Sequence, residues 1–178
     1  MKKAASIFLR ADMRPVDVQN LADWMENRDV TRYLNEEECA AEQLQELLET
    51  VPAPMLTYHF NQQGRFFMVC DAADRSSIGF VKLKKQADCR SDEIVFAIGD
   101  DTLWGNGYGS QAVRAAEAQA FLDWRAKKLT AKIYHGNSRS ARTVRRCGFR
   151  EERKLEELSC YSITQEEYFD LLLEKKRA

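Results

Sequence analysis

Residues 93–121 read EIVFAIGDDTLWGNGYGSQAVRAAEAQAF, and this stretch decides the fold. Its first third, Glu93 to Gly99, is rich in β-branched and aromatic residues and predicts a strand. From Gln111 to Arg125 the chain is rich in alanine, with apolar residues at helical spacing, which predicts a helix. A glycine-rich turn joins the two, so the stretch predicts a strand, a loop and a helix.

The turn contains Gly105, Gly107 and Gly109, which leave backbone N–H groups unobstructed at the start of the helix. Such a loop favours a phosphate or pyrophosphate. A tight turn with no ligand is the alternative. The loop is not a Walker loop, because Ser110 is followed by Gln111 rather than lysine. A dinucleotide motif is also weak, since Ser110 stands at the third glycine position.

Outward from this stretch, the chain alternates strands and helices. Strands are predicted at about 65–71 and 78–85 before it and at 128–134, 150–155 and 158–163 after it. Helices are predicted from Pro15, from about Glu38 to Pro52 and Pro54, at 138–146, and after the capping box of Thr164 and Glu167. With a short strand at 6–10, this order predicts a mixed α/β (α+β) fold. The sheet has six to seven strands, flanked by helices, with one parallel crossover. Residues 1–178 are expected to form a single domain.

The composition excludes several classes of protein. The chain has 27 basic and 28 acidic residues, for a net charge of −1, so it has no overall positive field to hold the phosphates of a nucleic acid, and the charge argues against such a partner. No apolar run approaches the roughly 20 residues that span a membrane. Arg10 and Asp12 interrupt the apolar start, so we expect a cytoplasmic protein without a signal peptide. Five scattered cysteines and two histidines predict reduced thiols and no metal site.

Two motifs carry a resemblance to a known family. Residues 93–121 resemble the acetyl-CoA-binding motif of the GNAT superfamily of N-acetyltransferases, in the W-G-x-G-Y-G form of the ribosomal-protein-alanine (Rim-type) branch. Residues 129–152, LTAKIYHGNSRSARTVRRCGFREE, are similar to its second motif, N-x-x-S/A-x-R-x-x-x-x-C-G-F. The resemblance implies the GNAT fold, in which a central pair of parallel strands splays apart, and acetyl-CoA as co-substrate without a metal.

The resemblance also assigns the residues that bind acetyl-CoA. Pantetheine would lie in the gap between the splayed strands and pair with the main chain near Phe96, Ala97 and Ile98. The pyrophosphate would lie on the loop Gly105, Asn106, Gly107, Tyr108, Gly109 and Ser110. Asn137 would reach the pantetheine arm, with helix capping as its alternative role. In the cluster Arg139, Arg142, Arg145 and Arg146, some residues, such as Arg142, would contact the 3′-phosphate; a solvated charged face is the alternative.

The chemistry expected from the resemblance is direct transfer of the acetyl group to an amine. Glu93 stands where this branch carries a general base, although a solvated strand end is the other interpretation. Many relatives have tyrosine as general acid where this sequence has Val144, which has no proton to give. Tyr134, Ser138, Ser140 and Cys147 lie nearby in sequence, but no motif places them.

The first helices wall the acceptor site in the resembled family, so Trp24, Arg28, Arg32 and Tyr33 are candidates to line it, or else they are core and surface residues. The acceptor is a primary amine, either a protein N-terminus or a small molecule. A second hypothesis is a degenerate domain that binds acyl-CoA as a sensor or interaction module without turnover. A monomer or a homodimer fits the sequence.

Overall fold

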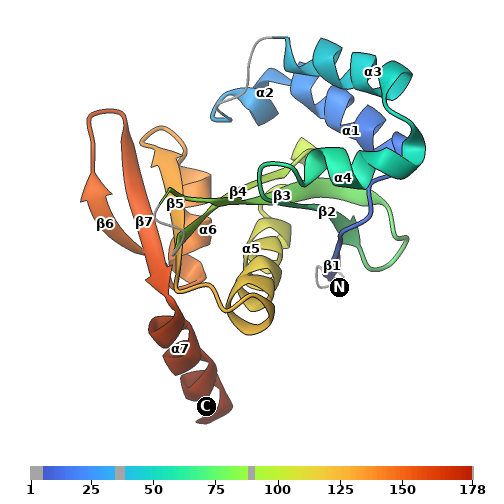
Figure 1. Ribbon diagram of the computed structural model, residues 1–178. Helices are drawn as coiled ribbons and strands as arrows, with labels where there is room; N and C mark the ends of the chain where they lie inside the picture. Colours follow the sequence, from blue (N-terminus) through green and yellow to red (C-terminus); the bar gives the residue numbers. More distant parts are fainter. Residues whose placement is uncertain (1–5, 35–38, 88–90, 178) are drawn as a thin grey trace.

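The computed structural model describes residues 6–34, 39–87 and 91–177 (Figure 1). Its centre is a mixed seven-stranded sheet in the order β1-β2-β3-β4-β5-β7-β6. The strands are β1 (Ile7–Arg10), β2 (Arg65–Asp71), β3 (Ser77–Lys85), β4 (Ser91–Ile98), β5 (Lys128–Tyr134), β6 (Arg150–Lys154) and β7 (Leu158–Thr164). Neighbouring strands are antiparallel except β4 and β5, which are parallel.

The parallel pair is joined only at one end. β4 and β5 are in register at Ser91↔Lys128, Asp92↔Leu129 and Glu93↔Thr130, and no pairing continues toward Ile98 or Tyr134. A parallel ladder normally runs the length of both strands. The strands therefore diverge after Glu93, and the predicted splayed pair is confirmed.

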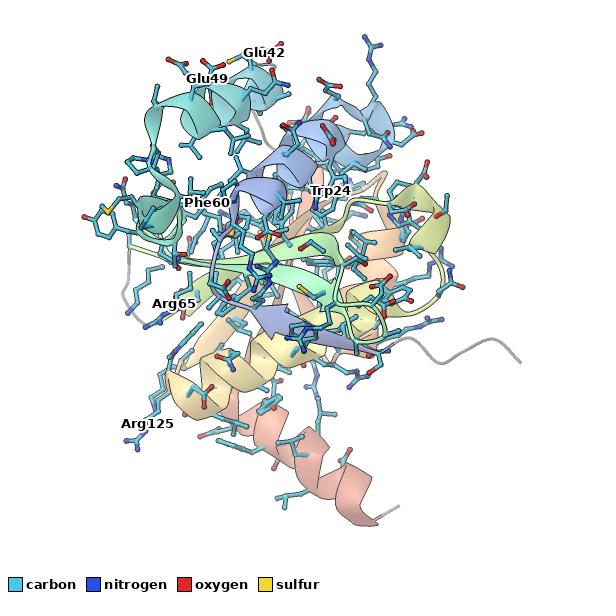
Figure 2. All side chains as sticks on the ribbon, turned by 90° about the vertical axis from the view of Figure 1, so that its right-hand side faces the viewer. Trp24, Glu42, Glu49, Phe60, Arg65 and Arg125 are labelled. Carbon is cyan, nitrogen blue, oxygen red and sulfur yellow. The ribbon has the colours of Figure 1, made fainter. Side chains whose placement is uncertain are left out.

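Helices cover both faces of the sheet (Figures 1 and 2). One face carries α1 (Pro15–Glu26), α2 (Arg28–Thr31), α3 (Ala40–Thr50) and α4 (Leu56–Phe60). The other carries α5 (Tyr108–Ala118), and the later helices are α6 (Ser138–Arg146) and α7 (Gln165–Arg177). Trp24 and Phe60 pack into the core under α1–α4, whereas Glu42 and Glu49 point outward in Figure 2.

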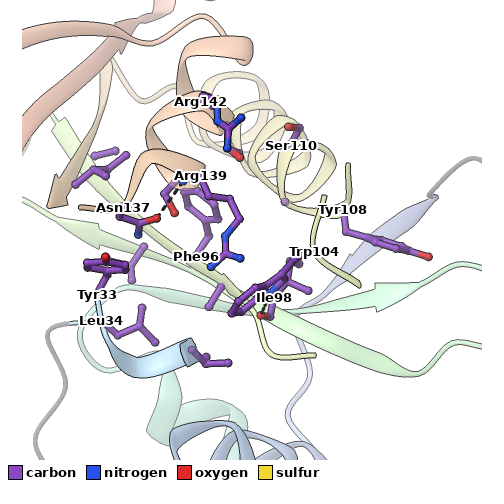
Figure 3. Close-up of a pocket in the computed structure, with 18 of the residues that line it drawn as sticks. Tyr33, Leu34, Phe96, Ile98, Trp104, Tyr108, Ser110, Asn137, Arg139 and Arg142 are labelled. Carbon is purple, nitrogen blue, oxygen red and sulfur yellow. Dashed lines mark hydrogen bonds between the residues drawn. The ribbon is translucent and has the colours of Figure 1, made fainter. Parts of the chain in front are cut away.

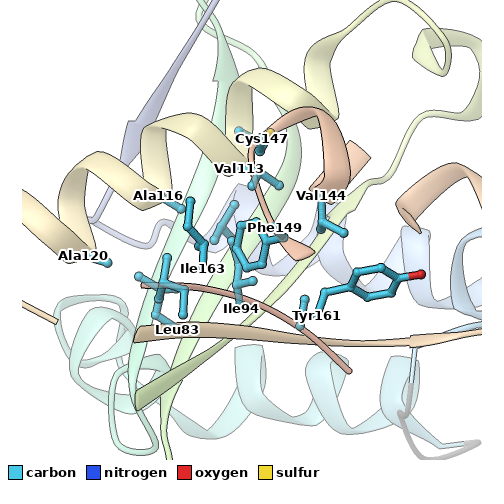
Figure 4. Packing of buried hydrophobic residues seen from close by; sticks show 14 of the residues in the cluster. Leu83, Ile94, Val113, Ala116, Ala120, Val144, Cys147, Phe149, Tyr161 and Ile163 are labelled. Carbon is cyan, nitrogen blue, oxygen red and sulfur yellow. The ribbon is translucent and has the colours of Figure 1, made fainter. Parts of the chain in front are cut away.

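Side-chain alternation along β4 divides the core into two clusters. Ile94 and Ile98 pack with α5, and with Val144, Phe149 and Ile163 (Figure 4). Val95 and Ala97 face the cluster under α1–α4. Because successive strand residues point to opposite faces, β4 is covered on both sides.

A buried ion pair ties α1 to the sheet. The Asp17 carboxylate is fully buried and accepts hydrogen bonds from Arg10 at 2.7 Å and Ser77 at 2.7 Å, and from the Arg14 backbone N–H at 2.9 Å. The hydrogen bond from its guanidinium to Asp17 raises the pKa of Arg10. One carboxylate therefore joins β1, the start of α1 and β3.

The helices differ from the sequence prediction in three places. The predicted start at Glu38 lies outside the described residues, and α3 is described from Ala40. The short helices α2 and α4 were not predicted; α2 begins because Asn27 accepts a hydrogen bond from the Asp29 N–H. The helix predicted at 111–125 begins at Tyr108, ends at Ala118 and continues as a π-helical turn, η3 (Gln119–Asp123). Among the described residues, no helix is both long and apolar enough to cross a membrane.

Candidate functional site

The space between the diverging strands is a cleft of about 350 Å³ (Figure 3). Its walls are Ile94 to Ile98 on β4, Ala131 to Ile133 on β5, the glycine loop, and the first turns of α6. The side nearest α1 is closed by Asp29 and Val30 of α2 and by Tyr33 and Leu34, which follow that helix. The cleft therefore joins the glycine loop at the wide end to the point where β4 and β5 meet.

The backbone of β4 has a free edge in this cleft. The Gly99 N–H donates to the Ile78 carbonyl and the Gln86 N–H to the Ser91 carbonyl, so the odd-numbered residues of β4 bond to β3. By the same alternation, the backbone groups of Phe96 and Ile98 face the cleft and those of Ala97 face β3. Trp104 Nε1–H donates to the Ile98 carbonyl at 2.8 Å. Phe96 therefore presents its backbone N–H and carbonyl to the cleft, whereas the Ile98 carbonyl is already bonded to Trp104 and only its N–H is open; Ala97 also lines the cleft.

The glycine loop has the geometry of an anion site. Gly105 and Gly107 have φ of 79° and 91°, which favour glycine, and no heavy atom lies within 4 Å of a Cβ built on either residue. Gly107 is the N-cap of α5, so the first N–H groups of an 11-residue helix point toward the loop. With Gly109 and Ser110, both glycines line the cleft. The loop therefore combines open space with the positive end of a helix dipole.

The other two predicted loop residues hold the loop in place. Asn106 donates from Nδ2 to the Leu103 carbonyl at 3.1 Å and is absent from the cleft walls. Tyr108 lines the cleft, but its hydroxyl donates to Asp71 at 2.8 Å, a bond that raises the pKa of Tyr108. The bond to Asp71 anchors the start of α5 to β2.

The first turn of α6 forms the opposite wall. Asn137 accepts a hydrogen bond from the Ser140 N–H at 3.1 Å and also lines the cleft, so capping and cleft contact coexist. Arg142 lies on the cleft wall near Ser110 (Figure 3). The Arg139 guanidinium carbon lies 3.4 Å from the centroid of the Trp104 ring, and desolvation lowers the pKa of Arg139. This wall is therefore strongly cationic.

Glu93 lies where the two strands part, on the face of the sheet that carries α1. Its Oε2 accepts from Lys132 Nζ at 2.9 Å and from Gln86 Nε2 at 3.0 Å. The Glu93 side chain is 15% exposed and does not line the cleft, whereas Lys132 does. Val144 is fully buried in the core and presents no group to the cleft.

The candidate acceptor residues are only partly brought together. Tyr33 lines the cleft, and its hydroxyl lies 2.8 Å from where a Cβ on Gly136 would be. The Trp24 ring instead packs against Gly99, where a side chain in place of the glycine hydrogen would collide with the ring. Arg28 is exposed, and neither Trp24 nor Arg28 lines the cleft. Sequence reasoning missed Asp29, Val30, Leu34 and Lys132. The Asn27 cap was the available signal for the first two, because it starts a new helix beside the cleft.

Comparison with known families identifies the fold. Residues 7–150 match the family model described as the acetyltransferase (GNAT) domain, which is most of the chain. The chain belongs to the GNAT acetyltransferase family. As a member of this family it is an acyltransferase. No curated protein matches the sequence.

Solved structures share the GNAT fold at low sequence identity. A spermidine N-acetyltransferase from Vibrio cholerae, solved with CoA and spermine, is 22% identical with a TM-score of 0.76, covering 92% of this chain and 98% of its own. A GNAT-family acetyltransferase from Bacillus anthracis is 19% identical, with a TM-score of 0.74 and the same coverage of both chains. An aminoglycoside acetyltransferase solved with coenzyme A is 16% identical with a TM-score of 0.74, covering 97% and 100%.

No metal site accompanies the cleft in the residues that the structure describes, since none of their His, Cys, Asp and Glu side chains gather in threes or more. Of the cysteines described, Cys147 is buried and donates to the Ser110 carbonyl at 3.5 Å, and Cys70 is buried under α1.

Proposed function

We propose that this GNAT protein is an acetyl-CoA-dependent N-acetyltransferase that moves the acetyl group directly to a primary amine. One observation carries the proposal. The splayed β4–β5 cleft, with a free backbone edge, opens at its wide end onto the glycine loop and the α5 N-terminus. A thioester on a long polar arm that ends in phosphates fits this combination. Its phosphates need an anion site, which the loop supplies, and its arm needs hydrogen-bond partners, which the β4 backbone supplies.

The residues present are suited to acetyl-CoA. The backbone groups of Phe96 and Ile98 would pair with pantetheine, and Gly105, Gly107, Gly109 and Ser110 would surround the pyrophosphate. Arg142 would pair with the 3′-phosphate, because guanidinium groups bind phosphate oxygens in pairs. Asn137 would border the pantetheine arm while it caps α6.

The acceptor amine would enter from the α2 side. Glu93 would act as general base through a water molecule, since its carboxylate lies on the α1 face, beside the cleft wall that Lys132 forms. Backbone N–H groups on β4 would polarise the thioester carbonyl. Direct transfer is favoured over an acyl-enzyme, because the Cys147 thiol is buried and bonded to the Ser110 carbonyl.

For the acceptor we propose two classes. The W-G-x-G-Y-G form of the loop favours the Rim-type branch and hence a protein N-terminus, bound against Tyr33 and Leu34. The similarity to spermidine and aminoglycoside acetyltransferases supports a small-molecule amine instead. We further propose that residues 1–178 act as one cytoplasmic domain, monomeric or homodimeric.

A second candidate function rests on Val144. This residue occupies the family's usual tyrosine position and is fully buried, so the family's proton donor is absent. A domain that binds acyl-CoA as a sensor or interaction module without turnover would tolerate that replacement. Such a protein would bind the thioester and release no thiol.

The two candidates are separated by titration calorimetry with acetyl-CoA, followed by a thiol-release assay in the same preparation. The amine panel contains N-terminal peptides, polyamines and aminoglycosides. We expect saturable binding and thiol release with one amine class. Binding without release across the panel would favour the sensor, and absence of acetyl-CoA binding would refute both.

A further inference from the structure

The reaction needs a proton for the leaving thiolate, and the cleft lacks the usual donor. We propose that Lys132 supplies this proton and that Glu93 and Lys132 act as one acid–base pair. This inference rests on the proposed function, because it assigns the missing acid to the same reaction. Lys132 borders the cleft, donates a hydrogen bond to Glu93 and lies just beyond the point where β4 and β5 part.

Lys132 is the ionisable side chain of the cleft wall nearest the narrow end. The strand pairing stops at Glu93↔Thr130, and Lys132 lies two residues beyond Thr130 on the same face of β5. The phosphates would occupy the glycine loop at the wide end, so the thioester end of the donor points toward the narrow end. The Lys132 ammonium group on that wall would therefore face the departing sulfur.

The other proton-bearing side chains on the wall are less suitable. Tyr108 donates its hydroxyl proton to Asp71, away from the cleft. Tyr33 lies beside Gly136, beyond the end of β5 and toward the open mouth. Ser110, Ser140 and Thr143 lie on the α5–α6 side, and alcohols are far weaker acids than an alkylammonium group. Lys132 is therefore the best matched donor on the wall that the structure describes.

The contacts of Glu93 complete the pair. Lys132 Nζ and Gln86 Nε2 both donate to Glu93 Oε2, at 2.9 and 3.0 Å. In the described part of the chain, Glu93 Oε1 accepts no hydrogen bond, so it is the oxygen available to the acceptor amine or to a bridging water. The carboxylate is thus held in one orientation by the group that we assign as acid.

The proton steps balance without an outside reagent. The amine nitrogen bonds to the acetyl carbon, and the carbon–sulfur bond breaks with its electron pair on sulfur. Lys132 gives one proton to sulfur, and the new amide nitrogen loses its extra proton to Glu93. The protonated carboxyl then returns that proton to the neutral Lys132 amine across their 2.9 Å contact. Both groups regain their starting charge after each turnover.

Other charged groups face the pair from the neighbouring strands. Lys84 stands opposite Glu93 on β3, and Cys160 stands opposite Lys132 on β7. Arg153 stands opposite Cys160 on β6. None of these three is a carboxylate. Glu152 on β6 borders a second hollow together with Lys132, but its Oε1 accepts from Lys128 at 2.6 Å, whereas Lys132 donates to Glu93 on β4.

The test compares kcat and the acetyl-CoA KM of four variants. Lys132→Met should lower kcat by about 10²-fold or more, the contribution typical of a general acid, with little change in KM. Lys132→Arg keeps the charge and the contact with Glu93 but cannot release a proton near neutral pH, so it should be as slow as Lys132→Met. Glu93→Gln should also be slow. Lys128→Met is the matched control, because Lys128 lies on the same strand and face and pairs with Glu152 at 2.6 Å.

The comparison of Lys132→Arg with Lys132→Met gives a readout that a structural role would not move. A proton donor at this position makes both variants equally slow in kcat and leaves the acetyl-CoA KM unchanged. Recovery of activity by Lys132→Arg would show that Lys132 only positions Glu93 and would overturn the inference. Full activity of Lys132→Met, or its loss together with acetyl-CoA binding, would also overturn it. Failure of the wild type to acetylate any amine would refute the proposed function itself.

Discussion

Replacing Gly107 by alanine tests whether the loop is an anion site or only a tight turn. Gly107 has φ of 91°, and no heavy atom lies within 4 Å of the position that a Cβ would take. In the free protein the new methyl therefore costs only backbone strain, about 1–2 kcal/mol. For a domain of this size that corresponds to a fall in Tm of roughly 2–8 °C.

The effect on acetyl-CoA binding should be larger. The methyl would occupy the space through which a phosphate approaches the first N–H groups of α5. Loss of one charge-assisted hydrogen bond costs about 1.5–3 kcal/mol, which is roughly a 10- to 100-fold weaker Kd. Calorimetric titration of Gly107→Ala with acetyl-CoA measures this directly.

Gly148→Ala is the matched control. Gly148 also has a positive φ, 103°, but it lies at the end of α6, where a side chain would collide with Leu171. Strain and overpacking should destabilise this variant by about 2–5 kcal/mol, while acetyl-CoA binding to the folded fraction stays normal. If Gly107→Ala lost stability and bound acetyl-CoA as tightly as the wild type, the loop would be a turn without a ligand.

Three further predictions concern the rest of the site and its support. Asp17→Asn should destabilise the protein by about 3–5 kcal/mol in urea unfolding, because it leaves the Arg10 guanidinium, 10% exposed, with only a 3.5 Å contact to the exposed Asp12 carboxylate; a change below about 1 kcal/mol would contradict the role of this ion pair. Tyr108→Phe should cost about 1 kcal/mol. Since the pKa of folded Tyr108 is raised by its bond to Asp71, the wild-type advantage should be complete below the ordinary tyrosine pKa near 10 and disappear as pH rises through the folded value, measured by Tm against pH. Arg142→Ala should weaken acetyl-CoA binding about 10-fold at low salt and leave the binding of a donor without the 3′-phosphate unchanged; equal loss for both donors would place Arg142 elsewhere on the ligand.

The sheet could be predicted from the sequence because each strand carries a local pattern. The runs predicted at 65–71, 78–85 and 128–134 are β-branched or alternating, and they are strands Arg65–Asp71, Ser77–Lys85 and Lys128–Tyr134 in the structure. The capping box is also confirmed, since Thr164 and Glu167 exchange hydrogen bonds at the start of α7. Each of these signals lies within a few residues, so no knowledge of tertiary contacts was needed.

The acceptor side of the cleft could not be predicted in the same way. The helix α2 has only four residues, too few to show a period, yet it brings Asp29 and Val30 to the cleft wall. Trp24 was a candidate there because of its place in the chain, but the absence of a side chain at Gly99 lets its ring pack against the sheet instead. Contacts between segments far apart in sequence decide both outcomes.

Lys132 shows why the chemistry at the narrow end was hidden as well. A lysine alternating with Ala131 and Ile133 is typical of a solvated strand face, and the side chain is indeed about half exposed. Lys132 differs from an ordinary strand lysine because it lies just beyond the point where β4 and β5 part. There its side chain contacts the Glu93 carboxylate on β4 and also borders the gap between the two strands. Beyond that point, Ile94 on β4 and Ala131 on β5 pack into the core cluster that includes side chains of α5 and α6. The positions of the acid and the base that we assign are therefore defined by where the pairing of β4 and β5 stops, which no local sequence pattern shows.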